Sequence, residues 1–476
     1  MDRSTIWVYT LAAKASIVKG SYRVNTPIES TFKSPVCAWT SNADIETVHI
    51  SAQQSPINGE ISIPGSKSYT NRALILAAAA QGTSVITGAL RSEDSYWCIE
   101  ALRLLGAVID VAMDSEQITI EGRAGHWQPA EIYIGSAGTT ARFLTSVLAL
   151  STQVPIVVRA SAQLSGRPMA PLLVALAQLG ARFEYLGAQH ALPLRILPAV
   201  NTGGETNIAG HLSSQFLSGL LMAAPLAHKA VSICVDGDIV QEDYVAMTIA
   251  TMREFGVEPH QHENTYIIAP NAYTSADYAI EADASTASYF FGLAAATGGQ
   301  IQVANLGRNS QQPDIQVLSI FEQLGCQVSL VPSGGVRLTG PQQLIGDQSF
   351  DMNHCSDVAL TIAALAPRAT GSIAITNITH IRNHECDRID AMTQSLQTVG
   401  ISVEALEDGW RIEPGAPKST TLETYDDHRM AMSLSLLGLQ SGVTLKKPMC
   451  VSKTCPDFFT MLTSLGVEVV LSKLNI

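Results

Sequence analysis

The chain has 476 residues, of which 46% are hydrophobic and 15% are charged, and its formal net charge is −13. The length allows roughly two to four domains with large cores, the hydrophobic content argues against disorder, and the sequence has no run of about 18 hydrophobic residues that could span a membrane. The negative charge argues against a protein that binds nucleic acid or an anionic membrane, because both partners require a basic surface. A small anionic ligand would have to be attracted by a few local Arg and Lys residues.

Residues 1–46 carry no motif, and we predict a loosely structured N-terminal extension. This segment is rich in Ser, Thr and basic residues, so an organellar transit peptide is an alternative, and so is a start site assigned too early. The eight cysteines of the chain include no pair with C-x2-C spacing, which argues against a zinc site. Reduced thiols in a cytoplasmic protein are the simplest interpretation.

One pattern recurs six times along the chain: an apolar helix, a glycine, and an alternating strand. Such a glycine can adopt the left-handed conformation that ends a helix and turns the chain into the next strand. The spacing predicts six units of about 70 residues, each with two helices and three or four strands, in an α/β or α+β protein. Two lobes of three units are the simplest grouping, and chance recurrence of a common helix end is the alternative. The glycines are 74, 76, 69, 75 and 66 residues apart, at Gly106, Gly180, Gly256, Gly325, Gly400 and Gly466.

The first candidate for chemistry is the segment 63–72, which runs from a Pro-Gly turn into an apolar stretch at 73–80. We predict a helix that begins here with Ser66 or Ser68 as its cap. Lys67 is unusual at this place, because a cation at a helix N-terminus opposes the helix dipole. Lys67, Arg72 and the first amides of the helix could together hold an anion. A capped helix with two solvated cations is the alternative.

Three further junctions between a turn and a helix follow, at 135–142, 165–169 and 213–215. The first is Gly-Ser-Ala-Gly-Thr-Thr-Ala-Arg, whose small residues allow a ligand to approach the backbone. The second, Ser-Gly-Arg-Pro-Met, places Arg167 at the start of a helix. The third, Ser-Ser-Gln, offers two hydroxyls and one side-chain amide to a phosphate. An ordinary turn or helix cap is the alternative at each.

The C-terminal half contains charged clusters at 382–388, 426–430 and 452–457. On a predicted helix through 382–388, Glu385 and His384 both lie on the same face as Arg388. Asp357 directly precedes a predicted apolar helix at 358–366, where a carboxylate is favourable with or without a function. Surface salt bridges and solvated loop charges are the alternatives.

Seven basic residues stand at these junctions beside small or hydroxyl residues. If the junctions converge, they build a cationic cleft for a phosphorylated and carboxylated ligand. Glu385 and Asp357 would then be the natural groups to move protons in it. The seven are Lys67, Arg72, Arg142, Arg167, Arg388, Arg429 and Lys453.

In this order the segments resemble the EPSP synthase family, the 3-phosphoshikimate 1-carboxyvinyltransferases, from about residue 47 to the C-terminus. Further matching segments are 283–290, 307–310, Asp-His-Arg-Met-Ala at 427–431 and Lys-Thr-Cys-Pro-Asp at 453–457. The resemblance implies a two-lobed inside-out α/β barrel with three βαβαββ repeats in each lobe. One lobe would contain residues 47–66 and 281–476, the other residues 67–280, and the active site would lie in the cleft between them.

The resemblance also implies a reaction of the shikimate pathway, by which aromatic amino acids are made. The enolpyruvyl group of phosphoenolpyruvate moves to the 5-hydroxyl of shikimate 3-phosphate and phosphate is released, without a metal or an organic cofactor. Both partners are small molecules, nucleic acid and membrane are not involved, and we expect a monomer. The catalytic residues implied are Lys67, Asp357 and Glu385. Those for phosphoenolpyruvate are Lys67, Gly138, Arg167, Gln215, Arg388, Arg429 and Lys453. Those for shikimate 3-phosphate are Ser68, Arg72, Ser213, Ser214, Gln215, Tyr244, Asp357, His380 and His384.

Four positions depart from the common pattern of the family: Ser136, Gln241, His380 and His384. His384 would be cationic at neutral pH only if Glu385 or the substrate phosphate raised its pKa. Because the departures fall on the shikimate side, a paralogue that acts on another alcohol is one alternative. A UDP-N-acetylglucosamine enolpyruvyl transferase is disfavoured, since the chain has no cysteine shortly before Arg167. A ligand-binding relative without activity is disfavoured by the retained Lys67, Asp357 and Glu385.

Overall fold

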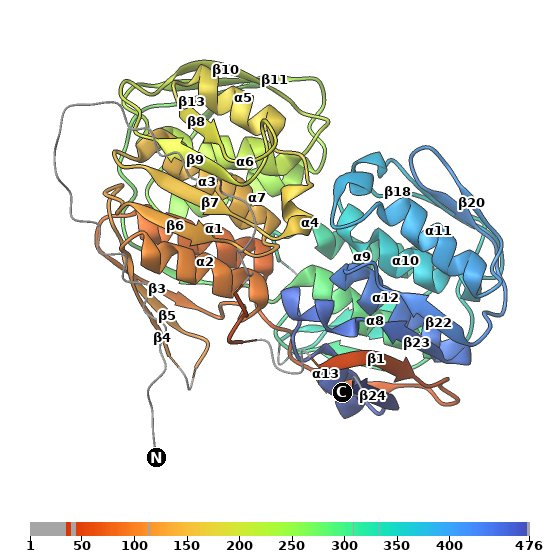
Figure 1. Ribbon diagram of the computed structural model, residues 1–476. Helices are drawn as coiled ribbons and strands as arrows, with labels where there is room; N and C mark the ends of the chain where they lie inside the picture. Colours follow the sequence, from red (N-terminus) through yellow and green to blue (C-terminus); the bar gives the residue numbers. More distant parts are fainter. Residues whose placement is uncertain (1–34, 40–43, 113–114, 308, 333, 474–476) are drawn as a thin grey trace. The chain divides into compact units, whose positions relative to one another are not determined.

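The computed structural model describes residues 35–39, 44–112, 115–307, 309–332 and 334–473. The prediction of a loose extension at 1–46 falls almost entirely outside these residues. Within them, strands and helices alternate along the whole chain (Figure 1). The longest of these helices have 14 residues, and none is long and apolar enough to cross a membrane.

The strands of the described residues form six sheets of four strands each. The strands are β1 (Ile45–Ile50), β2 (Asn58–Ile61), β3 (Thr83–Thr87), β4 (Val108–Val111), β5 (Ile118–Glu121), β6 (Ala130–Tyr133), β7 (Ile156–Arg159), β8 (Arg182–Tyr185), β9 (Leu194–Leu197), β10 (Gly204–Ala209), β11 (Val231–Asp236), β12 (His260–His262), β13 (Thr265–Ile268), β14 (Asp277–Ala279), β15 (Gln300–Val303), β16 (Gln327–Leu330), β17 (Val336–Thr339), β18 (Gln348–Asp351), β19 (Ile373–Thr376), β20 (Val403–Ala405), β21 (Trp410–Ile412), β22 (Thr420–Glu423), β23 (Val443–Lys446) and β24 (Val469–Lys473).

The helices between them are mostly short. The α-helices are α1 (Lys67–Ala79), α2 (Glu93–Leu104), α3 (Gly138–Ser151), α4 (Ala162–Ser165), α5 (Ala170–Gln178), α6 (Ser214–Ala223), α7 (Glu242–Glu254), α8 (Ala284–Thr297), α9 (Val317–Gln323), α10 (Ala359–Leu365), α11 (Arg388–Thr398), α12 (His428–Ser441) and α13 (Phe458–Ser464). The 3₁₀ turns are η1 (Ala224–Leu226), η2 (Pro313–Gln316), η3 (Ser356–Val358), η4 (Ala366–Arg368), η5 (Thr379–Asn383) and η6 (Pro448–Lys453).

All six sheets share one pairing pattern, so the predicted repeat is confirmed. In spatial order they are β14-β3-β5-β4, β6-β7-β9-β8, β10-β11-β13-β12, β2-β15-β17-β16, β18-β19-β21-β20 and β22-β23-β1-β24. In each of them the first pair is parallel and the other two pairs are antiparallel, as in β10-β11-β13-β12. The six predicted glycines all follow a helix and have φ between +82° and +100°, which favours glycine because it has no Cβ.

In three of the sheets, one of the four strands comes from a distant part of the chain. β1 pairs with β23 and β24 near the opposite end of the chain (Figure 1), and β2 pairs in parallel with β15. β14 pairs in parallel with β3.

The buried hydrophobic residues form two separate clusters. One runs from Val48 to Ile63 and from Ala282 to Val467, and the other runs from Tyr69 to Ile280. The chain therefore passes from one core to the other near residue 66 and returns near residue 281. No single module has a complete core of its own. The modules are stabilised because they bury their apolar faces against one another in these two shared cores.

Candidate active site

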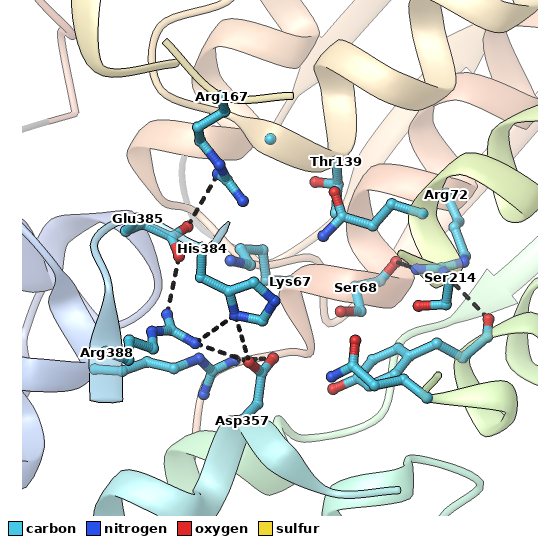
Figure 2. A pocket seen from close by; sticks show the side chains of 15 residues that line it. Lys67, Ser68, Arg72, Thr139, Arg167, Ser214, Asp357, His384, Glu385 and Arg388 are labelled. Carbon is cyan, nitrogen blue, oxygen red and sulfur yellow. Dashed lines mark hydrogen bonds and ion pairs between the residues drawn. The ribbon is translucent and has the colours of Figure 1, made fainter. Parts of the chain in front are cut away.

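A polar pocket of about 570 Å³ is lined by residues that come from both cores. Figure 2 draws the side chains that line it and labels ten of them, which converge from several helix starts. The lining residues are Lys67, Ser68, Arg72, Gly138, Thr139, Arg167, Ser214, Gln215, Gln241, Tyr244, Asp357, His384, Glu385, Arg388 and Arg429.

Most of the site residues expected from the sequence line this pocket, and three do not. Ser213 and His380 line a neighbouring cavity of about 520 Å³. The residues that it shares with the first are Arg167, Gln215, Gln241 and His384. Lys453 reaches the pocket through Glu385, whose Oε1 lies 2.8 Å from its Nζ. Of the seven junction cations, Arg142 belongs to the second cavity rather than the first.

The pocket is positive although the protein is negative. Its lining contains five Lys or Arg residues against two carboxylates, Asp357 and Glu385, while the whole chain has a net charge of −13. Local charges of this kind dominate the field inside a cleft, because low-dielectric walls focus it. The pocket is therefore suited to an anionic ligand.

Lys67 opens α1, as predicted, but the cap of this helix differs from the prediction. Ser66 occupies the N-cap position and its hydroxyl makes no capping bond. Instead the amide of Lys67 donates to Oδ2 of Asp283 (3.2 Å), which comes from the distant start of α8. The first amide of α1 is thus satisfied by a carboxylate from another helix start, which accepts a stronger hydrogen bond than a neutral group would.

The ammonium of Lys67 is buried in the wall of the pocket. Its Nζ lies 3.8 Å from Oδ2 of Asp94, whose side chain is 1% exposed. Burial lowers the pKa of Lys67. The neighbouring cations Lys453 and Arg429 lower it further, whereas the carboxylates of Asp94 and Glu385 act to raise it. A lysine with a lowered pKa gives up its proton more readily than a solvated one.

Arg388 is the centre of an ion-pair cluster and is 1% exposed. Its guanidinium donates to Asp357 (3.0 Å), Glu385 (2.9 Å) and Asp427 (2.8 Å). Burial acts to lower the pKa of Arg388, but the three carboxylates outweigh it and raise the pKa. The cluster fixes both pocket carboxylates to one rigid donor.

The prediction of a helix through 382–388 is wrong. Residues 379–383 form η5, residues 384–387 are irregular, and α11 begins only at Arg388. Asp387 ends the irregular stretch because its side chain caps α11 by accepting from the amide of Asp390 (3.0 Å). The predicted contacts of Arg388 with Glu385 and His384 nevertheless form, at 2.9 Å each.

Both pocket carboxylates are held in their ionised form. Glu385 contacts Lys453 at 2.8 Å and Arg167 at 3.4 Å, in addition to Arg388. Burial would raise the pKa of Glu385, but these cations outweigh it and hold the pKa well below its usual range. For Asp357 burial is likewise outweighed, by Arg429 at 2.8 Å and by Arg388, so its pKa is also lowered.

Arg72 marks the other end of the pocket. Its Nε donates to the hydroxyl of Thr248 (2.7 Å), its Nη1 donates to the carbonyl of Ser68 (2.9 Å), and its guanidinium lies 4.7 Å from the ring centre of Phe143. At the start of α6 the hydroxyl of Ser213 accepts from the amide of Gln215 (3.3 Å), as an N-cap does. The first turn of this helix faces the pocket with Ser214 and Gln215.

Gly138 begins α3 and leaves room for two guanidinium groups. A Cβ at this position would lie 2.7 Å from Nη1 of Arg167 and 3.2 Å from Nη1 of Arg142. Any side chain here would therefore push Arg167 away from its contact with Glu385. This is a structural reason for glycine that the sequence alone does not provide.

Among the four unusual positions, His384 and Gln241 line the pocket and Ser136 does not. The hydroxyl of Ser136 instead contacts that of Ser161 at 2.8 Å. Gln241 donates from Nε2 to the hydroxyl of Ser356 (2.9 Å), which lies 2.7 Å from Nε2 of His380. These contacts connect the two cores beside the pocket.

His384 is neutral in this arrangement. Burial lowers its pKa well below the ordinary value, and Arg388 lowers it further. Because a guanidinium can only donate, Nδ1 of His384 accepts from Arg388 and the ring proton lies on Nε2. Glu385 and Asp357 do not compensate, so the pKa increase considered above does not occur in the absence of substrate.

We therefore predict that His384 does not titrate in the folded protein between pH 5 and 8. Its ring signals, assigned by comparison with His384→Asn, should stay constant in an NMR titration of the native protein. The histidines of a urea-unfolded sample should titrate near the ordinary value of about 6.5. Protonation of His384 in the folded protein near pH 6.5 would contradict this assignment.

Several residues of the site were not assigned a role from the sequence. Asp94 faces Lys67, Asp427 binds Arg388, and Gln163 donates to the carbonyl oxygens of Glu385 (3.3 Å) and Asp426 (3.2 Å). Asp94 lies in the first turn of α2 and Asp427 is the N-cap of α12. A carboxylate at a helix start is common for local reasons alone, so Asp94 did not stand out and Asp427 was noted only as part of the segments 426–430 and 427–431.

Comparisons with known proteins agree with each other. The model of the EPSP synthase (3-phosphoshikimate 1-carboxyvinyltransferase) family matches residues 51–462. A 3-phosphoshikimate 1-carboxyvinyltransferase 2 of Halalkalibacterium halodurans is 45% identical over 449 residues, 93% of this chain and 99% of that protein. A 3-phosphoshikimate 1-carboxyvinyltransferase of Trichormus variabilis is 39% identical over 427 residues, 87% of this chain and 98% of that protein.

Two solved structures are similar to the fold. EPSP synthase from Acinetobacter baumannii has a TM-score of 0.75 and 24% identity, and the match covers 90% of this chain and 100% of that one. The enolpyruvyl transferase NikO from Streptomyces tendae has a TM-score of 0.71 and 16% identity, and the match covers 90% of this chain and 99% of that one. At these identities the likeness concerns the fold.

Proposed function

Because the chain belongs to the EPSP synthase family, we propose that it transfers the enolpyruvyl group of phosphoenolpyruvate to the 5-hydroxyl of shikimate 3-phosphate. The products are 5-enolpyruvylshikimate 3-phosphate and phosphate, as in the shikimate pathway. The observation that supports this most strongly is the convergence of five cations and two ionised carboxylates in one pocket. Two anionic substrates need the cations, and a reaction of proton transfers needs the carboxylates.

In this proposal phosphoenolpyruvate binds among Lys67, Arg167, Arg388, Arg429 and Lys453, close to Gly138 and Gln215. The acceptor binds toward Ser68, Arg72, Ser213, Ser214 and Tyr244, with His380 and His384 at its edge. The guanidinium groups neutralise two substrates that would otherwise repel each other. Neutral His384 would serve the acceptor as a hydrogen-bond donor from Nε2, without adding charge.

The chemistry requires proton transfers in both of its steps. The methylene carbon of phosphoenolpyruvate gains a proton while the acceptor hydroxyl attacks the neighbouring carbon and loses its own proton. The resulting tetrahedral ketal then loses a methyl proton and expels phosphate, which takes up a proton as it leaves, and the double bond is restored in the product. Lys67 and Glu385 face the phosphoenolpyruvate side and serve the methylene carbon, whereas Asp357 accepts the proton of the hydroxyl.

Substrate binding would prepare the carboxylates for this work. In the free protein Lys453, Arg167 and Arg388 hold the pKa of Glu385 low, and Arg429 and Arg388 hold that of Asp357 low. Both carboxylates are therefore weak bases. Substrate anions compete for the same guanidinium groups, which weakens that effect and raises the two pKa values. Proton transfer therefore becomes favourable only when the pocket is filled.

The two lobes belong to the same proposal. Residues 47–66 with 281–476 would form one lobe and residues 67–280 the other, supported by the division of the two cores. Reaction in a cleft between lobes would exclude water and strengthen the ion pairs. We also propose a monomer that needs no cofactor, and a cytoplasmic location. The cysteines of the described residues form no disulfide, in keeping with that location.

Phosphate release from phosphoenolpyruvate tests the function. We expect release by the purified protein with shikimate 3-phosphate and none without it. Release with another alcohol but not with shikimate 3-phosphate would instead identify a paralogue, an alternative kept open by Gln241, His380 and His384 and by the fold shared with an enolpyruvyl transferase named NikO. UDP-N-acetylglucosamine should not act as an acceptor.

A further inference from the structure

Asp314 is a buried carboxylate beside the pocket that takes no part in the mechanism above. It lies in η2 and is 1% exposed. Its Oδ2 accepts hydrogen bonds from the hydroxyls of Tyr244 (3.1 Å) and Ser285. Its Oδ1 is buried and has no hydrogen-bond partner within the described part of the chain. A buried oxygen without a partner is costly for a charged carboxylate.

The bond between Tyr244 and Asp314 connects the two cores at the wall of the pocket. Tyr244 lies on α7 and packs against the core of residues 69–280, whereas Ile315, next to Asp314, packs against the other core. Tyr244 also lines the pocket, and its carbonyl accepts from Nη2 of Arg72 (3.2 Å). This places it at the end where the acceptor is proposed to bind.

The surroundings of Asp314 give its carboxyl group a higher pKa than that of Asp357. Burial and then Asp357 raise the pKa of Asp314 to about 7, Asp283 adds to this, and Arg429 opposes it. Tyr244 and Ser285 are the other polar groups packed against it. Asp357 is held ionised by Arg429 and Arg388. Two neighbouring carboxylates in environments that push their pKa values apart commonly have different roles.

We propose that Asp314 is a positioning residue whose proton decides whether Tyr244 can donate a hydrogen bond to the anionic acceptor. While Asp314 is ionised, the hydroxyl of Tyr244 donates its hydrogen bond to the carboxylate, and the negative charge of Asp314 repels the phosphate of the acceptor. Once Asp314 is protonated, it donates to the phenol oxygen, and the hydroxyl of Tyr244 is free to donate into the pocket. This inference rests on the proposed function.

The consequence is that acceptor binding is linked to the uptake of one proton by Asp314. As pH rises above the pKa of Asp314, the protonated form becomes rarer and binding weakens. The apparent Kd should then increase by up to roughly tenfold for each pH unit, which is the limit for one linked proton. Protonation of the acceptor phosphate adds its own pH dependence, which is the same for every variant of the protein.

Calorimetric titration of shikimate 3-phosphate from pH 6 to 9 separates the two effects. Asp314→Asn keeps an acceptor and a donor for Tyr244 but cannot ionise. We expect the Kd of the wild type to rise more steeply with pH than the Kd of Asp314→Asn, and the two to differ most at pH 9. Equal slopes in the two proteins would overturn the inference.

Tyr244→Phe provides a second test that does not require Asp314 to be changed. It should weaken acceptor binding several-fold at pH 6, where the hydroxyl is free, and have little effect at pH 9, where Asp314 already holds it. A loss that is the same at both pH values would overturn the inference. Failure of the wild type to bind the acceptor at any pH would contradict the proposed function itself, and the inference with it.

Discussion

Lys67→Met should lower kcat by roughly 10²- to 10⁴-fold, the range for loss of a general acid or base. The methionine has a similar length but can neither donate a proton nor balance the charge of the substrates. The effect should appear in kcat as well as KM, because Lys67 acts on the methylene carbon in the transition state. The rate of phosphate release with both substrates at saturation measures kcat.

The fold should survive this substitution. Lys67 is a cation at the start of α1, where the helix dipole opposes it, and its burial disfavours the charged form. Its removal therefore eliminates two unfavourable contributions, which offset the loss of the 3.8 Å ion pair with Asp94. The thermal unfolding midpoint should remain within a few degrees of the wild type. Lys418→Met, at an exposed position, is the matched control and should retain full activity; unchanged activity of Lys67→Met would refute the role given to Lys67.

Arg388→Met should be the most destabilising single change in the site, at about 3–5 kcal/mol, which is typical when a buried ion pair loses one partner. It leaves Asp427, Glu385 and Asp357 without their shared donor. Part of this loss depends on pH. Arg388 helps to hold the pKa values of Glu385 and Asp357 below their ordinary values, and a lowered carboxylate pKa stabilises the fold above the unfolded pKa but no longer does so once pH falls below the folded one. The deficit of Arg388→Met should therefore be largest near neutral pH and smaller in acid.

Arg382→Met is the control for that prediction. Arg382 forms a similar ion pair with Asp387 at 3.1 Å, but its side chain is 31% exposed and that of Asp387 is 41% exposed. Exposed pairs contribute only about 0–1 kcal/mol. Thermal and urea unfolding of the two variants at pH 6 and 8 measures the difference. Similar losses for Arg382→Met and Arg388→Met would show that the buried cluster does not have the importance assigned to it.

The repeat could be predicted from the sequence because it depends on local rules. A glycine after an apolar helix, such as Gly106 or Gly400, marks a helix end whatever the rest of the chain does. The pairing of β1 with β23, or of β14 with β3, could not be predicted in the same way. Strand pairs separated by hundreds of residues carry no local signal, and only the family resemblance suggested that the chain crosses between lobes.

Many residues that line the pocket could be picked out from the sequence, because cations beside small residues are unusual at helix starts. Lys67 and Arg167 stood out for that reason. Asp94 and Asp314 did not, since their positions at or near helix starts have an ordinary local explanation, and Asp427 was noted only as part of the segments 426–430 and 427–431. The irregular segment 384–387 was wrongly predicted as helix because the periodic charges suggested one, whereas the cap by Asp387 delays the helix to Arg388.

That one pocket both protonates phosphoenolpyruvate and activates the acceptor hydroxyl is tested most directly by running the reaction in D₂O. With wild-type protein and both substrates, mass and NMR spectra of the product should show 5-enolpyruvylshikimate 3-phosphate with deuterium on its vinyl methylene carbon, since that carbon passes through a methyl group. Omitting shikimate 3-phosphate should abolish product formation. Phosphate released without this product, or a product free of deuterium at that carbon, would contradict the mechanism.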